Sequence, residues 1–400
     1  MSRFETLRFI NAAHFFDHFF LLIFPTAALA IARDWQISYG EALALGTPIF
    51  VMFGLGTLPA GWLGDRMDRL NLLAMFFLGC GLSSLVISLS RGPISLMIGL
   101  GLLGLFASLY HPVGLALVTG LGGRTGRALA VNGVAGNLGL AGAAVLTGIL
   151  ATFGGWQMAF AVPGVVSGII ALALFFRHRH HSNLSNQNAA PEHNDRASGS
   201  LRTQITVFGV ICVAALFGGL VYNVITISLP KFFDERLIGV GGDLTWIGAS
   251  TGLVFAIAAF AQLPVGELLD RYGPKSLLMG LLIAQVILLV ALATMTGWLA
   301  LVIALILVTM VFAQIPITSW LLGHYVRSSF RARAASVEYV LSLGMAAAVV
   351  PLIAGLHGAG FGFDFQYFGI ALSAAVVLVA AVFLPRGRAV PIAAQLQSEE

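Results

Sequence analysis

Three ionisable side chains lie within five residues of each other in the first long apolar segment of the chain. His14, Asp17 and His18 stand at positions i, i+3 and i+4, a spacing that places them on one face of an α-helix. A charge buried among apolar groups is costly unless a partner or water compensates it. An imidazole and a carboxylate within reach of each other can exchange a proton. The spacing therefore predicts a proton-handling site, and a polar cluster that only ties helices together is the alternative.

A fourth ionisable residue, His111, lies in a later apolar segment between Tyr110 and Pro112. The proline ring removes a backbone hydrogen bond and is expected to kink its helix, which exposes carbonyl groups. We expect Tyr110 and His111 to line the same path as the first three residues, and a capped structural histidine is the alternative for His111. Imidazoles together with a carboxylate also suit a divalent transition-metal ion, so a metal cage remains open as a second interpretation. No resident metal or other cofactor is expected.

The composition requires a lipid environment around these residues. Hydrophobic residues make up 58% of the 400 and charged residues only 10%, whereas soluble proteins carry about 25% charged residues. The two cysteines, Cys80 and Cys212, both lie in apolar segments and predict neither a disulfide framework nor a thiolate metal site.

The chain is an internal duplication with an offset of 205 residues. The pairs that align without a gap are Pro25 with Pro230, Pro59 with Pro264, Gly61 with Gly266, Asp65 with Asp270, and Arg66 with Arg271. Two homologous apolar halves are typical of a transporter whose substrate path lies between them.

Hydropathy predicts twelve membrane-spanning helices, because about 20 apolar residues cross the hydrocarbon core as a helix. The predicted spans are 8–31, 43–63, 71–90, 93–120, 126–153, 157–176, 204–229, 245–268, 275–296, 298–322, 334–356 and 364–385. We therefore expect an all-α integral membrane protein with two six-helix pseudo-repeat bundles around a central cavity, residues 1–176 and 204–388. Residues 177–203, which include His178, His180 and His181, are predicted to be a disordered cytoplasmic linker, and residues 389–400 a cytoplasmic tail.

Basic residues predict the orientation. Of the 21 lysines and arginines, only Arg33, Arg91, Lys231 and Arg236 fall outside the loops and tails that share a side with the N-terminus. The positive-inside rule then places both termini and the linker in the cytoplasm, with the protein in the inner (plasma) membrane. The first segment lacks a small-residue cleavage site and carries ionisable groups, so it is expected to be a retained helix.

The duplication identifies further candidates for the path. Tyr222 and Asn223 are the counterparts of Asp17 and His18, Gln314 and Pro316 are near the counterpart of the His111 kink, and Asn132 aligns with Glu338 when Arg127 is set against Arg333. Glu338 is predicted to be either a gate salt bridge or a proton site. Asn137 and Gln262 are further cavity candidates, with interhelical hydrogen bonding as the alternative.

Glycines at every third position, Gly133, Gly136, Gly139 and Gly142, predict close helix packing and not a phosphate loop. The sequence offers no serine triad, paired catalytic carboxylates or cysteine nucleophile at a plausible spacing, so we expect no enzyme. The arginines follow the inner loops and do not indicate nucleic-acid binding.

Six plus six spans, a basic central linker and the loop Gly-x-x-x-Asp-Arg-x-x-Arg after the second span resemble the major facilitator superfamily. The resemblance implies that the loop motif and its echo lock the two halves on the cytoplasmic side when the carrier faces out. The gating residues expected on this basis and from the path analysis are Gly61, Asp65, Arg66, Arg69, Gly266, Asp270, Arg271 and Glu338. The first copy has Asp68 where a glycine is usual, whereas the second copy has Gly273.

Three other segments resemble the fosmidomycin-resistance efflux branch of that superfamily. They are His14-Phe15-Phe16-Asp17-His18, Tyr110-His111-Pro112, and Gly122-Gly123-Arg124 followed by Gly136-Asn137-Leu138-Gly139. The resemblance implies an efflux carrier. Together with the ionisable cluster of the first segment, it leads us to expect a proton-coupled antiporter that exports a small organic compound. We expect the protein to be a monomer. The alternatives are a carrier of a divalent metal ion or metal chelate, a proton-coupled importer, and a non-transporting membrane sensor.

Overall fold

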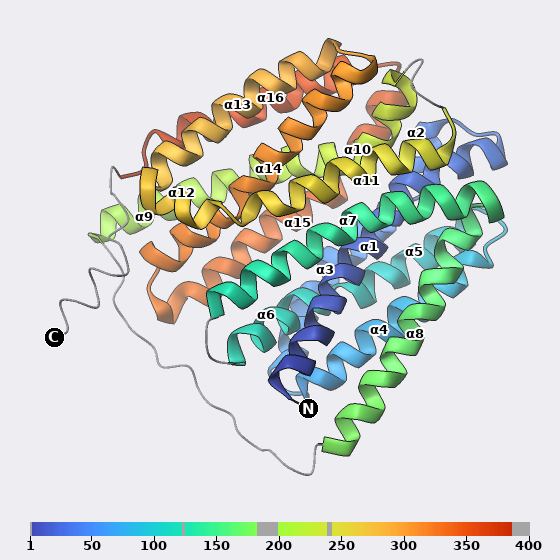
Figure 1. Ribbon diagram of the computed structural model, residues 1–400, viewed down its shortest axis with the longest axis horizontal. Coiled ribbons are helices and arrows are strands. Elements are labelled where there is room, and N and C mark those ends of the chain that lie inside the picture. Colours follow the sequence, from blue (N-terminus) through green and yellow to red (C-terminus); the bar gives the residue numbers. More distant parts are fainter. Residues whose placement is uncertain (1, 122–124, 182–198, 238–241, 386–400) are drawn as a thin grey trace.

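The computed structural model describes residues 2–121, 125–181, 199–237 and 242–385. These residues contain helices and no β-strand. Twelve helical stretches in them are long and apolar enough to span a membrane, so the predicted all-helical fold class is confirmed. Figure 1 shows the helices of the first half (blue to green) packed beside those of the second half (yellow to red).

The helices of the first half run in sequence order from the N-terminus to the linker. They are α1 (Arg3–Trp35), α2 (Tyr39–Ala44), α3 (Thr47–Gly64), α4 (Arg69–Ser88), α5 (Pro93–Ala107), α6 (Tyr110–Gly120), α7 (Thr125–Gly154) and α8 (Trp156–His181).

The described residues of the second half form eight α-helices and two short irregular helical segments. They are α9 (Leu201–Val213), the π-helical turn η1 (Ala214–Gly218), α10 (Gly219–Arg236), α11 (Leu244–Ala259), the 3₁₀ turn η2 (Phe260–Gln262), α12 (Val265–Tyr272), α13 (Pro274–Thr294), α14 (Gly297–Tyr325), α15 (Ser328–Gly358) and α16 (Phe363–Ala381).

Polar residues that precede apolar segments begin several of these helices. Ser2 accepts a hydrogen bond of 3.2 Å from the backbone N–H of Glu5, and the Glu5 carboxylate accepts one of 3.0 Å from the N–H of Ser2. Ser38 and Glu41 form the same capping box at the start of α2. These bonds satisfy backbone donors that have no partner inside the helix, which fixes where the apolar segments become helical.

The linker prediction is wrong at both of its ends. α8 continues through His181 and α9 already begins at Leu201, so helix covers both edges of the range 177–203. The charged last turns of α8 are anchored by side chains of the same half: Arg177 pairs with Glu5, and His178 Nε2 lies 3.0 Å from the Asp68 carboxylate. The rest of the predicted linker, 182–198, lies outside the described residues, as do the whole predicted tail, 389–400, and Gly122 to Arg124.

The two predicted proline kinks differ from each other. The first half has a break in its fourth span, where α5 ends at Ala107 and α6 begins at Tyr110, two residues before Pro112. In the second half Pro316 lies inside one continuous helix, α14. A continuous helix can still bend at a proline, so the pairing of the two kinks stays a prediction.

The glycines of α7 allow close packing, as predicted. A Cβ at Gly139 would collide with the backbone carbonyl of Phe15 on α1, and a Cβ at Gly142 would lie 2.8 Å from the Phe15 ring. Further along the same helix, Gly148 lies against the backbone of Leu244, and Gly248 lies against that of Ala144. Because α11 belongs to the second half, these glycines bring the backbones of the two halves into contact.

We call the end of the molecule that holds the N-terminus of α1 and the loop between α3 and α4 the basic end. At the other end, side chains join the halves: Arg33 Nη2 of α1 lies 3.0 Å from Asp234 Oδ1 of α10. Thr245 Oγ1 of α11 donates a hydrogen bond of 3.0 Å to Thr152 Oγ1 of α7. Gly40 of α2 fits against the backbone of Ala354 on α15. The halves are therefore packed together at the end opposite the basic end.

Candidate functional site

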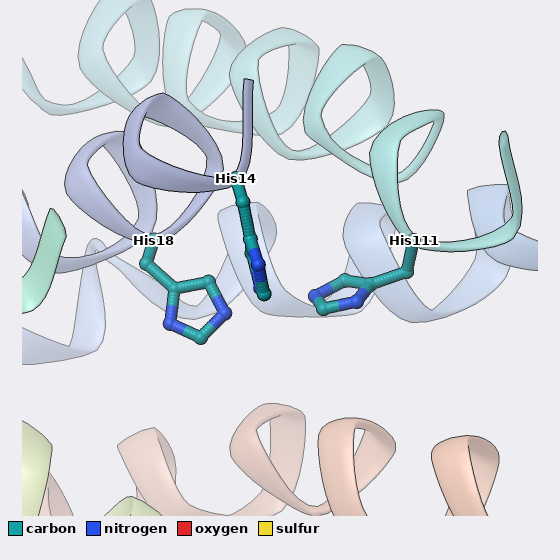
Figure 2. Close-up of side chains that lie close together, drawn as sticks. All are labelled: His14, His18 and His111. Carbon is teal, nitrogen blue, oxygen red and sulfur yellow. The ribbon is translucent and has the colours of Figure 1, made fainter. Parts of the chain in front are cut away.

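A cluster of three histidines lies where the two halves face each other. His14 and His18 are one turn apart on α1, and His111 lies on the first turn of α6. One ring nitrogen from each residue can be chosen so that all three lie within 4.8 Å of one another. Figure 2 shows the three rings converging on one space, with helices of the second half across it. The i, i+4 spacing thus places His14 and His18 on one face of α1, as predicted. The helix break before α6 brings the His111 ring to the same place.

Asp17 lies beside this cluster in a fully buried position. Its side chain has no exposed surface, and its Oδ2 lies 3.2 Å from Nε2 of His111. Neither carboxylate oxygen has a hydrogen-bond partner among the described residues. Although the distance to His111 is that of an ion pair, the geometry is not that of a hydrogen bond. Asp17 is therefore a buried carboxylate whose negative charge the described residues do not neutralise through hydrogen bonds.

Asn132 of α7 contacts residues of the cluster through both its backbone carbonyl and its side chain. Its backbone carbonyl lies 2.7 Å from Nδ1 of His14, and because a carbonyl only accepts, Nδ1 must carry the proton of that bond. The Asn132 side chain accepts a hydrogen bond of 3.0 Å from the Tyr110 hydroxyl and donates one of 3.0 Å to Asn11 Oδ1. In neutral His14 the lone pair is consequently on Nε2. The ring is also stacked on Tyr110, with centroids 4.8 Å apart.

The backbone of α7 leaves just enough room for the His14 ring. A Cβ at Gly136 would lie 2.6 Å from His14 Nε2 and 2.7 Å from its neighbouring ring carbons. Real Cβ atoms do not approach other atoms this closely, so glycine at this position is required for the observed ring placement.

The second half contributes aromatic side chains to the cluster. The ring of Tyr339 on α15 lies 5.7 Å from that of His111, and Tyr222 on α10 is within electrostatic range of Asp17. Asn223, the other predicted counterpart, instead donates its amide hydrogens to the backbone carbonyls of Gly219 and Ser342 at 2.8 and 3.0 Å. Its amide group therefore joins α10 to α15.

Of three other predicted path residues, two make polar contacts inside the second half and the third is buried. Gln314 accepts a hydrogen bond of 3.0 Å from Gln285 inside the second half. Glu338 interacts with Thr318, also of the second half. Asn137 is buried, and its amide nitrogen has no hydrogen-bond partner in the described part of the chain.

Gln262 lies at the boundary between the halves. A Cβ at Gly133 of α7 would be 2.9 Å from its Oε1, so the Gln262 amide packs directly on the helix that carries Asn132.

The loop-motif residues lie at the basic end. Asp65, Arg66 and Arg69 are exposed, and the Arg66 guanidinium stacks over the Trp62 ring of its own half, 4.1 Å from the centroid. Arg69 donates a weak hydrogen bond of 3.4 Å to the Gly64 carbonyl.

The two copies of the motif turn the chain by different means. Asp68, which replaces the usual glycine, caps α4 by accepting hydrogen bonds from the N–H groups of Leu70 and Asn71 at 2.9 and 3.0 Å. In the second copy Gly273 adopts a φ of 75° before α13, a conformation that glycine adopts at little cost. Gly61, Gly266 and Arg271 lie on the helices before these turns, and the side chain of Asp270 lies outside the described set.

Sequence reasoning missed Asn11, Phe53 and Tyr339 as neighbours of the cluster. Asn11 lies three residues before His14, so the helical spacing that selected His14 and Asp17 could have selected it as well. Phe53 and Tyr339 approach His111, with ring centroids at 6.0 and 5.7 Å, through contacts between distant helices that no local pattern reveals.

Twelve membrane-length helices in two homologous halves, with buried polar groups where the halves meet, define a polytopic membrane transporter. The family model of the Major Facilitator Superfamily matches residues 9–313. The chain belongs to this superfamily, and it is a secondary transporter and not an enzyme. No curated protein matches the chain.

Solved structures agree with this assignment at the level of the fold. A bacterial homologue of the human lysosomal transporter Spinster, in an inward-facing and unoccupied conformation, has a TM-score of 0.73 at 15% identity, with 96% of each chain covered. A D-xylose-proton symporter has a TM-score of 0.72 at 16% identity, covering 96% of this chain and 98% of the other. A transporter of the POT family in complex with 5-aminolevulinic acid has a TM-score of 0.72 at 12% identity, covering 95% and 96%. At sequence identities this low, the matches show a shared fold alone.

Proposed function

We propose that the chain is a proton-coupled transporter in which Asp17 takes up and releases the coupling proton. The observation that carries the proposal is the buried Asp17 carboxylate, which has no hydrogen-bond partner among the described residues and lies 3.2 Å from His111. A carboxylate in this environment is costly when charged and unpaired. It is stabilised when it gains a proton or when His111 is charged beside it.

The position of the pair suits alternating access. Asp17 and His111 lie on different helices of the first half, while Tyr339 and Tyr222 approach them from the second half. When the halves rock against each other, Asp17 becomes accessible to water first from one side of the membrane and then from the other. The residue itself stays on α1. Proton uptake on one side and release on the other would then couple to the movement of substrate.

Export of a small organic compound is our proposal for the direction and cargo, and it rests on the resemblance of the segments around His14, His111 and Gly136 to the fosmidomycin-resistance branch. Import by symport is the alternative, because a proton symporter shares the fold. The placement of the basic loops supports an inner-membrane protein with both termini in the cytoplasm. The carrier is proposed to act as a monomer in lipid, with protons and a small molecule as its partners and no nucleic acid.

A susceptibility and uptake screen tests the proposed function. A strain that overproduces the protein should tolerate at least one compound of a chemically diverse panel better than the vector control, and should accumulate less of it. A protonophore should remove the difference in accumulation. Greater accumulation that the protonophore abolishes would indicate import, and transport insensitive to the protonophore would contradict proton coupling.

The loop motif is proposed to act as the gate at the basic end. In this structure Asp65 and Arg66 are exposed, and the halves are packed together at the opposite end. The proposed role of Asp65 is to make a charge-assisted contact only after the halves close at the basic end. Gly61, Arg69, Gly266, Asp270 and Arg271 are proposed to belong to the same gate, and Glu338 to be either a gate residue or a second proton site.

Replacing Asp65 with alanine should shift the protein toward the state that is open at the basic end. A charge-assisted hydrogen bond contributes about 1.5–3 kcal/mol, so its loss should change the ratio of the two states by about tenfold or more. Labelling rates of single cysteines placed between the halves near the basic end, in a background without Cys80 and Cys212, report the shift.

Asp68→Asn is the matched control for the gate. It removes a carboxylate three residues away that pairs within its own half, with His178, and it keeps an oxygen that can cap α4. Labelling should be unchanged in this control. Equal labelling of the Asp65→Ala variant and the wild type would rule out the gate role.

A further inference from the structure

We propose that His14, His18 and His111 form a binding site for a divalent transition-metal ion, and that the small organic cargo of the proposed function enters this site as a chelate of such an ion. The inference rests on the proposed function for transport, because it names the substrate of that carrier. Binding of the ion can nevertheless be measured without any transport.

The first argument is the convergence of the three imidazoles. One nitrogen from each ring can be chosen so that the three lie within 4.8 Å of one another, and the rings point into a common space (Figure 2). Two nitrogens bound to one tetrahedral zinc ion lie about 3.4 Å apart, since each Zn–N bond is about 2.0–2.1 Å long. Small rotations of the three side chains would bring their nitrogens from within 4.8 Å of one another to about 3.4 Å. Imidazole nitrogen is a preferred ligand of zinc, nickel, cobalt and copper ions.

The second argument is the orientation of His14. A histidine that binds a metal usually donates its other ring N–H to a carbonyl or carboxylate, which fixes the tautomer. His14 Nδ1 donates to the Asn132 carbonyl at 2.7 Å, so the Nε2 lone pair of the neutral ring remains for an ion. Asn132 is itself held by Tyr110 and Asn11.

The third argument is the charge beside the cluster. Asp17 is fully buried, both of its oxygens lack a hydrogen-bond partner among the described residues, and one of them lies 3.2 Å from His111 Nε2. A negative charge placed here would attract a cation to the three imidazoles and repel an anion. Asp17 can thus stabilise the ion through its charge, acting across His111.

The coordination would suit a cargo better than a structural ion. Structural zinc sites are closed by four protein ligands, whereas sites with three protein ligands keep a position for water or another molecule. Three histidines leave such a position, which a chelator could occupy. All three histidines belong to the first half, so movement of the second half relative to them could open the site to either side.

The test uses the full-length chain, purified with a tag that contains no histidine and reconstituted in lipid nanodiscs. Titration with Co²⁺ is followed by visible absorption, which reports low-symmetry coordination, and titration with Zn²⁺ by calorimetry. We expect one ion per chain with a dissociation constant in the micromolar range. His14→Gln, His18→Gln and His111→Gln should each weaken binding by about tenfold or more.

The matched control replaces the histidines in and beside the linker, His178, His180, His181 and His193, with glutamine. This control should bind one ion with the same spectrum as the wild type. It shows whether the linker histidines bind the ion, even if a cluster variant fails to fold. The inference is overturned if the wild type binds no ion, if binding disappears in the linker control, or if all three folded cluster variants retain wild-type affinity.

A second arm distinguishes the sources of the ion by repeating the Co²⁺ titration with labelled citrate. Citrate retained with the ion supports both the ion site and a chelate as the cargo. Citrate that only competes supports the ion site and overturns the chelate as the cargo. Failure of ion binding leaves the proton-coupled transport proposal standing, because the compound screen with a protonophore tests that proposal separately.

Discussion

Replacing Asp17 with asparagine should abolish proton-driven transport while the protein remains folded and inserted. Asparagine has nearly the same shape but cannot exchange a proton, and Asp17 is the buried acid beside His111. Because proton transfer by a positioned group contributes about a hundredfold or more, uptake against a gradient should fall by at least this factor. The measurement is concentrative transport of a compound from the screen into proteoliposomes with an imposed pH gradient.

Asp34→Asn is the matched control for this prediction, since it makes the same substitution near the other end of α1. Asp34 accepts a hydrogen bond of 3.0 Å from the Trp156 indole, which asparagine can also accept. We expect this variant to transport normally. Full-rate accumulation by a folded Asp17→Asn variant would show that the coupling proton binds elsewhere.

Helical periodicity predicted one side of the site correctly. His14, Asp17 and His18 share a face of α1 because their spacing is local, and that face meets the other polar residues. The nearest partner of Asp17 could not be predicted in the same way. His111 is 94 residues further along the chain, and its approach depends on the helix break after Ala107 and on how α6 packs against α1.

The role of Asn132 also depends on information that the sequence does not display. The duplication selected it as the counterpart of Glu338, yet its closest link to the cluster is a bond from His14 to its backbone carbonyl. Any residue type has that carbonyl. What the sequence does display is Gly136, one turn further along α7, without which the His14 ring would not fit.

Hydropathy predicted the twelve spans well, whereas the duplication predicted local backbone detail less well. α3 runs without interruption through Pro59 to Gly64, whereas the corresponding stretch of the second half divides into η2 and α12 around Pro264. A proline removes one backbone hydrogen bond in either case. Whether the helix bends or breaks there depends on its neighbours, which have diverged between the halves.

A bulky residue at Gly248 should separate the two halves at the end opposite the basic end. Gly248 of α11 faces the backbone of Ala144 on α7, and Gly148 faces Leu244 in return, so the Gly248→Leu side chain would have no space while these helices remain in contact. Overpacking costs about 1–3 kcal/mol, which should disfavour the present arrangement by about tenfold. Spin labels at the exposed Phe153 and Trp298, which lie at this end in different halves, should report longer distances.

The control for this variant is Gly209→Leu on α9, where an added Cβ would meet nothing within 4 Å. Both substitutions add the same apolar volume to a membrane helix, so only the contact between the halves distinguishes them. Transport should cease in Gly248→Leu, because a carrier that cannot close at one end cannot complete its cycle, and should continue in Gly209→Leu. If Gly248→Leu kept both the wild-type distances and the wild-type rate, the contact between α7 and α11 would not be part of the conformational change.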